Sequence, residues 1–237
     1  MISPASIRTP MIDRLYEDNH CLVVNKPAGI LSQGDATGDL SVVDWARADL
    51  KRRYDKPGAV YVGLVHRLDR PTSGVMLLAR TSKAAARLAA QFAAGTVEKR
   101  YWAVVEGRLE ADAGELLDGL KKDAEHNVVA VVPPGSPGSL AARLEYRVLS
   151  RARDQVLLEV RPITGRSHQI RAQLAARGLP IVGDRKYGAR SRLRALDGAP
   201  RVALHARELT FMHPTRRVPL SIEAPLPADW PPAFRTR

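Results

Sequence analysis

Three short apolar runs in the first third of the chain predict β-strands. They cover residues 21–25, 61–65 and 74–79, and the first of them is followed by turn-forming proline and glycine residues. The second and third runs enclose a polar turn centred on Asp69. The pattern therefore predicts a carboxylate held in a loop between two buried strands.

Helical spacing of apolar residues appears in three places. Residues 40–54 fit a short helix with a basic face, and residues 82–94 fit an amphipathic helix. The third helix is expected to begin at Ser167, a residue type that caps helices, and to end at Gly178. Helices of this length suit a layer packed against a sheet.

The remaining apolar stretches predict further strands. Residues 109–142 have a weaker pattern and a Pro-Gly-rich stretch, so we expect a hairpin-like excursion there. Elsewhere strands are expected at residues 99–105, 143–149, 155–161, 203–211 and 219–223. No repeat and no long linker divides the chain, and we expect a flexible leader (1–11), one main domain (12–225) and a proline-rich C-terminal tail (226–237).

Charge narrows the class of partner. The 237 residues include 37 Lys and Arg against 25 Asp and Glu, which gives a formal net charge of +12. Such a surface favours polyanions, with RNA or DNA ahead of acidic membrane surfaces, although charge also serves solubility alone. The single cysteine cannot form an internal disulfide, and no apolar run approaches the ~18 residues of a membrane span. We expect a soluble cytoplasmic protein with no membrane partner.

Several common chemistries lack their sequence motifs. The chain has no G-x-x-x-x-G-K-[ST] loop, no G-x-G-x-x-G motif and no G-x-S-x-G nucleophile elbow. Its six histidines are scattered without metal-ligand spacing, and one cysteine cannot build a thiolate zinc site. We expect neither a metal nor a nucleotide cofactor.

Asp69 is the first candidate for chemistry. It lies between Arg67 and Arg70 in the stretch HRLDRPTSG. Nearby positive charge and hydroxyl donors favour an ionised carboxylate, which suits a nucleophile or a base. The same residues also fit a salt-bridged surface turn, whose ion pairs contribute only about 0 to 1 kcal/mol. Local composition leaves both interpretations open.

Other polar side chains also allow two interpretations. Lys26, at the end of a strand, fits a phosphate or substrate contact or a solvated turn, and Tyr101, in an interior strand, fits a structural or an active-site role. His168 and Arg171 share one face of the third predicted helix. A basic loop follows that fits either phosphate contact or an exposed charged segment, with Arg185, Lys186, Arg190, Arg192 and Arg194.

The order of several motifs resembles the RluA-type pseudouridine synthases, in a form that lacks an S4 RNA-binding domain. The motifs are LVVNKPAGIL (22–31), HRLDRPTSG followed by VMLLAR (66–80), KRYWAVVEG (99–107), TGRSHQIR and LPIVGDRKYG (164–188), and LHARELTFMHP (204–214). The resemblance covers roughly residues 12–225. It implies an α+β fold, with a mixed, mostly antiparallel sheet split by a central cleft and flanked by helices.

The resemblance also implies an activity and its residues. The chain would isomerise uridine in RNA to pseudouridine, with Asp69 as the nucleophile. Tyr101 would pack on the base, Arg171 would pair with the aspartate, and Arg67 would fill the space left by the flipped nucleotide. The reaction needs no redox or metal cofactor. Attack of the carboxylate on C1′, addition to C6 and removal of a ribose proton all stay open as mechanisms.

RNA is the partner that the resemblance implies. We expect 23S rRNA or tRNA, with the target uridine in a loop or flipped from a stem, because a base inside a duplex cannot be reached. Expected RNA contacts are Arg67, Arg70, Lys26, Arg166, His168, Arg185 and Lys186, and the expected pocket wall is Leu64, Val65 and Ile170. Without an S4 domain the basic catalytic domain would find its RNA alone or with a partner, and we expect a monomer. Gln173 stands where many relatives have histidine.

Two other functions fit part of the pattern. A non-catalytic RNA-binding or ribosome-assembly factor that kept the fold would bind RNA with steep salt dependence and would tolerate the loss of Asp69. An aspartate-dependent N-glycosidase would release free uracil. The complete set of motifs favours the synthase.

Overall fold

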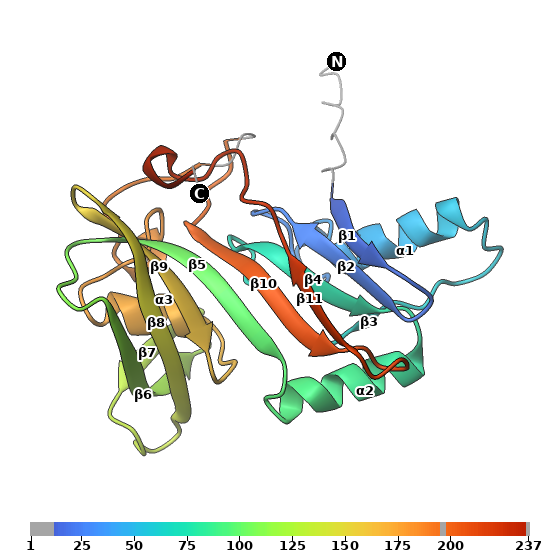
Figure 1. Ribbon diagram of the computed structural model, residues 1–237, viewed down its shortest axis with the longest axis horizontal. Coiled ribbons are helices and arrows are strands. Elements are labelled where there is room, and N and C mark those ends of the chain that lie inside the picture. Colours follow the sequence, from blue (N-terminus) through green and yellow to red (C-terminus); the bar gives the residue numbers. More distant parts are fainter. Residues whose placement is uncertain (1–11, 195–197, 236–237) are drawn as a thin grey trace.

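The described chain, residues 12–194 and 198–235 of this computed structural model, forms one open sheet of eleven strands (Figure 1). The main path through the sheet runs β1-β2-β4-β10-β5-β9-β8-β6-β7, with β3 paired to β4 and β11 paired to β10. The strands are β1 (Asp13–Glu17), β2 (Cys21–Lys26), β3 (Gly63–Leu64), β4 (Ser73–Ala79), β5 (Glu98–Glu106), β6 (Ala113–Asp123), β7 (Val128–Val132), β8 (Leu140–Ala152), β9 (Gln155–Pro162), β10 (Leu204–Met212) and β11 (Pro219–Glu223). The helices are α1 (Val42–Arg53), α2 (Ser82–Ala93) and α3 (Gln169–Ala175), with 3-10 turns at Arg185–Tyr187 and Pro232–Phe234.

A parallel pair at the centre makes the sheet mixed. Strands β4 and β10 run parallel and pair Ser73 with His205 and Gly74 with Ala206, and the other strand pairs among the described residues are antiparallel. Gly74 permits this contact, because its φ is +117° and a Cβ there would lie 2.2 Å from the Ala206 carbonyl oxygen. The predicted α+β class with a mostly antiparallel mixed sheet is confirmed.

Helices α1 and α2 cover opposite faces of β2 and β4. In β4, Met76 and Leu78 pack into the cluster that includes α1, whereas Val75 and Leu77 pack into the cluster that includes α2. Successive side chains of a strand point to opposite faces, so a strand covered on both faces has a continuous apolar sequence. This explains why the run at residues 74–79 shows no alternation.

The other half of the sheet has its own core. Ile170 and Leu174 of α3 are buried against β5, β8 and β9, as the spacing in the sequence predicts. Trp230 and Phe234 are buried in the same cluster, with Trp230 at 0% exposure. The proline-rich segment after β11 therefore packs back onto this core.

The N-cap of helix α3 lies one residue later than predicted, and the chain before the helix is closed differently. Its N-cap is His168, in the left-handed region with φ of 51°, and Ser167 does not cap it. The Gln169 side-chain oxygen instead accepts hydrogen bonds from the Arg166 backbone N–H (3.0 Å) and the Thr164 hydroxyl (2.8 Å). The side chain of the first helical residue thus ties the start of α3 to the turn that precedes it.

Strand lengths also depart from the sequence pattern. The region 109–142 does form a hairpin, β6 with β7, but β6 is an eleven-residue strand. The run at residues 61–65 yields only the two-residue β3, and β1 was not predicted. The expected leader, residues 1–11, lies outside the described residues. Among the helices that are described, none has both the length and the apolar character needed to cross a bilayer.

Candidate active site

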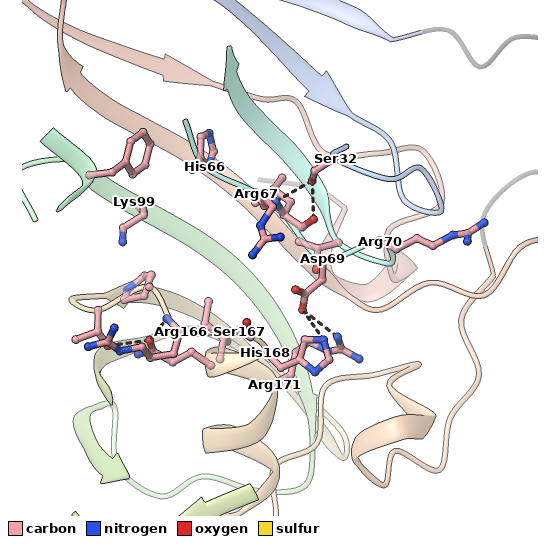
Figure 2. Close-up of a pocket in the computed structure, with 18 of the residues that line it drawn as sticks. Ser32, His66, Arg67, Asp69, Arg70, Lys99, Arg166, Ser167, His168 and Arg171 are labelled. Carbon is pink, nitrogen blue, oxygen red and sulfur yellow. Dashed lines mark hydrogen bonds and ion pairs between the residues drawn. The ribbon is translucent and has the colours of Figure 1, made fainter. Parts of the chain in front are cut away.

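Asp69 lies in the loop between β3 and β4, and the backbone on both sides of it is fixed. Its carbonyl oxygen accepts a hydrogen bond from the Thr72 N–H (3.0 Å). The Ser32 hydroxyl donates to the Leu68 carbonyl (2.7 Å) and accepts from the Leu68 N–H (3.0 Å), as Figure 2 shows. Leu68 itself is buried. Anchoring at the preceding residue limits how far the Asp69 carboxylate can move.

Lys26 stabilises the loop that carries Asp69. Its ammonium is fully buried and donates to three backbone carbonyls, those of Pro27 (3.0 Å), Ile30 (2.7 Å) and Arg70 (3.1 Å). Burial lowers the pKa of Lys26 to about 7. The predicted RNA contact by Lys26 is wrong. The side chain points into the protein, where its ammonium is bound by backbone carbonyls and cannot reach an RNA in the cavity. Its place is structural, joining the loop after β2 to the Asp69 loop.

Arg171 binds the Asp69 carboxylate from the opposite half of the sheet. Its Nη1 lies 2.9 Å from Asp69 Oδ2, while Nε and Nη2 donate to the two oxygens of Asp184 at 2.6 and 2.9 Å. Burial alone would lower the pKa of Arg171, but the hydrogen bonds and charge of Asp184 and Asp69 outweigh it and raise the pKa. The guanidinium is therefore a permanent cation, held flat by one carboxylate and presented to the other.

His168 stands beside the same carboxylate. Its Nε2 lies 3.9 Å from Asp69 Oδ2, and its Nδ1 lies 2.8 Å from the Tyr187 hydroxyl. That hydroxyl accepts the Val129 N–H (2.9 Å), which leaves its own proton for His168 Nδ1. Burial lowers the pKa of His168, so the ring is neutral near pH 7. The left-handed backbone at His168, which costs a non-glycine residue about 1 kcal/mol, turns this ring into the site.

Tyr101 joins the two halves of the site. It lies on β5 and packs against the core clusters on both sides. Burial, together with the negative charge of Asp69, raises its pKa, so the phenol keeps its proton at neutral pH. Among the described residues its hydroxyl has no hydrogen-bond partner. An apolar ring with a free hydroxyl is available to a planar ligand.

These residues surround a cavity of about 890 Å³ between the two halves of the sheet. The predicted wall residues Leu64, Val65 and Ile170 line it, and so do Asp69, Tyr101, Arg171, Arg67, Arg70, Arg166 and His168. The cleft that the resemblance implied is thus present. Ten of the thirteen predicted site residues meet here, drawn from segments far apart in the chain.

The arginines around the cavity differ in freedom. Arg67 is exposed and makes no hydrogen bond or ion pair within the part of the chain that is described. Arg70 is tied to the Asp39 carboxylate (2.8 Å) and the Gly29 carbonyl (2.9 Å), and Arg166 donates to the Ala141 carbonyl (3.0 Å). Arg67 is therefore the most available of the three to a bound polyanion.

Arg185 and Lys186 do not line the cavity. They form the 3-10 turn that follows Asp184, where Lys186 donates to the Asn127 carbonyl (3.2 Å) and Arg185 contacts the Ala189 carbonyl (3.5 Å). Asn127 does line the cavity. The turn thus sits behind the rim, and its predicted RNA contacts stay predictions.

Sequence reasoning missed three members of the site. Asp184 holds Arg171, Tyr187 orients His168 and stacks under the Arg171 guanidinium at 5.0 Å, and Ser32 fixes the Asp69 loop. Asp184 and Tyr187 are part of the motif LPIVGDRKYG, in which the basic residues Arg185 and Lys186 suggested a phosphate contact. The signal available was an acid placed directly after a buried apolar run.

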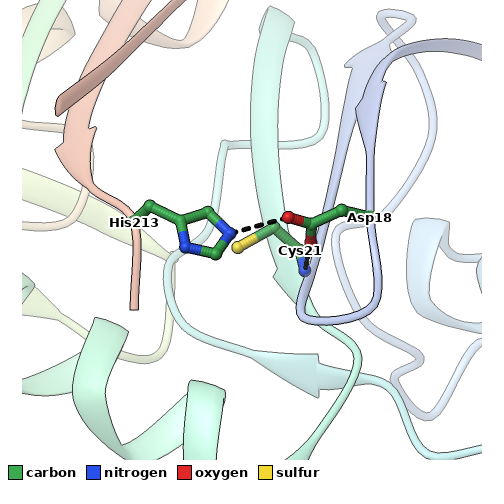
Figure 3. Close-up of side chains that lie close together, drawn as sticks. All are labelled: Asp18, Cys21 and His213. Carbon is green, nitrogen blue, oxygen red and sulfur yellow. Dashed lines mark hydrogen bonds and ion pairs between the residues drawn. The ribbon is translucent and has the colours of Figure 1, made fainter. Parts of the chain in front are cut away.

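A second cluster of possible metal ligands lies away from the cavity, formed by Asp18, Cys21 and His213 (Figure 3). Asp18 already accepts the backbone N–H groups of His20 and Cys21 at 2.8 Å and the His213 Nε2–H at 2.7 Å. His213 Nδ1 accepts from the Arg216 N–H (3.0 Å), and burial raises the pKa of the Cys21 thiol to about 12. These ligand atoms are already hydrogen-bonded and the thiol is protonated, so the cluster does not suit a metal ion. Its hydrogen bonds connect the β1–β2 turn to the chain after β10.

Comparison with known proteins identifies the family. A family model described as RNA pseudouridylate synthase matches residues 20–176. The ribosomal large subunit pseudouridine synthase C of Vibrio cholerae is 36% identical over 216 residues, which are 90% of this chain and 65% of that protein. The ribosomal large subunit pseudouridine synthase D of Xylella fastidiosa is 38% identical over 228 residues, 92% of this chain and 67% of that one. The chain thus spans about two thirds of the length of these relatives.

Solved structures share the fold. The human RNA pseudouridylate synthase domain containing 4 superposes with a TM-score of 0.74 at 28% identity and covers 91% of this chain and 88% of its own. The human protein named RNA pseudouridylate synthase domain containing 1 superposes with a TM-score of 0.71 at 24% identity. The match covers 95% of this chain and 86% of that one. The family model and the similarity over most of the sequence place the protein: it belongs to the RNA pseudouridylate synthase family.

Proposed function

We propose that this protein is an RNA pseudouridine synthase that isomerises uridines in rRNA or tRNA, with Asp69 as the nucleophile. The observation that carries the proposal is the Asp69–Arg171 pair in a cavity wide enough for a nucleotide. The Asp69 side chain is 26% exposed, so a substrate can reach it while Arg171, at 5%, stays buried. A charged, reachable carboxylate on a buried cation suits covalent or base catalysis.

The reaction rearranges bonds within one nucleotide. The N1–C1′ bond of uridine breaks, the C5–C1′ bond forms, the proton on C5 leaves and N1 gains a proton. In this proposal Asp69 acts on the sugar or the base, Arg171 holds the carboxylate in place, and Tyr101 stacks on the detached uracil. Tyr101 lines the cavity, and we assign the proton transfer at C5 to its hydroxyl, which has no partner in the described residues.

RNA recognition follows from charge and from the relatives. Arg67 offers a free guanidinium at the cavity, and the whole chain carries a formal net charge of +12. Relatives named as synthases of the ribosomal large subunit favour large-subunit rRNA over tRNA as the substrate. A monomeric state and a cytoplasmic location stay predictions from the sequence.

The test is release of tritium from RNA labelled at C5 of uridine. Purified protein without added cofactor is expected to release tritium from rRNA or tRNA of cells that lack the gene, and nuclease digests should then contain pseudouridine. Free uracil in the digest would instead indicate an N-glycosidase. RNA binding without release from either RNA would indicate the non-catalytic factor.

A further inference from the structure

The cavity has a second end, away from Asp69. In Figure 2, Asp69, His168 and Arg171 lie together on one side, Lys99 and His66 lie on the other, and Arg67 lies between. Lys99 is two residues before Tyr101 on β5, so the two side chains point to the same face of the strand. Both line the cavity.

Within the described ranges, Lys99 has no partner for its charge. Its ammonium makes no hydrogen bond or ion pair in the described residues, although it is partly buried in the cavity and burial lowers its pKa. The opposite wall is Gly165, where an added Cβ would lie 3.8 Å from Lys99 Nζ. Because Gly165 has no side chain, the part of the cavity beside the Lys99 ammonium is not filled by protein.

His66 adds a neutral donor to this end. Its Nε2 accepts the Leu77 N–H (2.9 Å), so the ring proton resides on Nδ1, which has no partner in the part of the chain that is described. Burial, followed by the nearby Lys99 charge, lowers the pKa of His66 to about 3. The ring stacks on Phe92 with centroids 4.7 Å apart, and this stacking fixes its orientation.

We propose that Lys99, with His66 and Gly165, forms a subsite for a backbone phosphate of the RNA, one nucleotide away from the uridine at Asp69. Lys99 and Tyr101 are two positions apart on β5, which corresponds to about 7 Å along the strand. That is the scale of the spacing between successive phosphates in an extended single strand. The inference rests on the proposed function, since it takes the target uridine to be at Asp69.

An anion fits this end better than a base. Phe92 occupies one face of the His66 ring, and the polar group that His66 has free is its Nδ1–H donor. An ammonium and an N–H donor, with no carboxylate paired to either in the described residues, instead match phosphate oxygens. Bound phosphate would supply the missing counter-charge for Lys99.

The salt dependence of RNA binding tests the subsite. Each phosphate contact to a single strand contributes about −0.7 to the slope of log affinity against log salt. Fluorescence anisotropy with a labelled single-stranded oligouridylate should show a slope about 0.7 shallower for Lys99→Met than for wild type. Two controls should keep the wild-type slope. Lys99→Arg retains the charge, and Lys83→Met removes the charge of an exposed lysine on α2.

A second pair of variants covers the case that Lys99→Met folds poorly. Gly165→Asp places a carboxylate beside Lys99 and should reduce the slope similarly, while the uncharged Gly165→Asn should keep it. An unchanged slope in both Lys99→Met and Gly165→Asp, or weaker binding with an unchanged slope, would overturn the subsite. Tritium release by the wild-type protein is measured separately, so failure of the proposed function is distinguished from failure of the subsite.

Discussion

Nη1 of Arg171 lies 2.9 Å from Oδ2 of Asp69, and the two residues come from segments 102 positions apart in the chain. The aspartate is in a loop of one half of the sheet, and the arginine is on the helix of the other half. Both residues line the cavity between the two halves. The geometry of the site therefore depends on the relative position of two separately packed cores.

Arg171→Lys tests this contact. A lysine keeps the charge but cannot bind Asp69 and both oxygens of Asp184 at once. We expect single-turnover tritium release to fall at least about a hundredfold, the scale of a small misplacement of a reacting group. RNA affinity, measured by filter binding, should stay within about threefold because Arg171 is buried. An equal loss in both measurements would show that Arg171 acts in binding.

Asp184→Asn tests the support behind Arg171. Removing one charge of a buried pair costs about 3 kcal/mol. We therefore expect urea unfolding to report a loss of that size, with slower tritium release. The matched control is Asp112→Asn, which removes an exposed ion pair to Arg151 and should change the unfolding free energy by less than about 1 kcal/mol. Equal effects of the two substitutions would contradict this role for Asp184.

Trp230→Ala tests whether the C-terminal segment is part of the core. Trp230 is fully buried, so its truncation should lower the unfolding free energy by about 4 kcal/mol. Met212→Ala, at a side chain that is 44% exposed, is the control and should change it by no more than about 0.5 kcal/mol. A loss near the control value would mean that the segment after β11 adds little to folding.

The pH dependence of stability tests the burial of His66. Its pKa is about 3 in the folded protein and about 6.5 when unfolded, so the unfolded state binds more protons between these values. The stability that His66 contributes is complete above pH 6.5 and is lost as the pH falls towards 3. Relative to His66→Gln, wild type should lose about 2 kcal/mol of unfolding free energy between about pH 7 and pH 4.5. Parallel pH profiles of the two proteins would contradict the assignment.

Much of the fold was readable because its segments are locally consistent. β4 is apolar throughout since α1 and α2 cover both of its faces, and α2 has both the spacing and the Thr81 cap of a helix. β6 was not readable as a long strand, because it carries Gly114, Lys121 and Lys122 and its regularity comes from pairing with β7 and β8. Such pairing is decided by partners distant in sequence.

The sequence motifs predicted which residues form the candidate site but not how these residues are arranged. Asp69, Tyr101 and Arg171 could be named from the order of motifs, but not their distances. Lys26 was misplaced because a lysine beside proline and glycine is usually solvated, and its burial depends on three carbonyls supplied by two loops. The pairing of Asp184 with Arg171 likewise depends on the turn after α3.

The most direct test of the central claim is tritium release by Asp69→Asn. The substitution keeps the size of the side chain and its hydrogen bond to Arg171 but removes the carboxylate nucleophile. Release from C5-labelled RNA should fall to background, while affinity for the same RNA and the unfolding midpoint stay close to wild type. Release by Asp69→Asn at a rate near that of wild type would show that Asp69 is not the nucleophile.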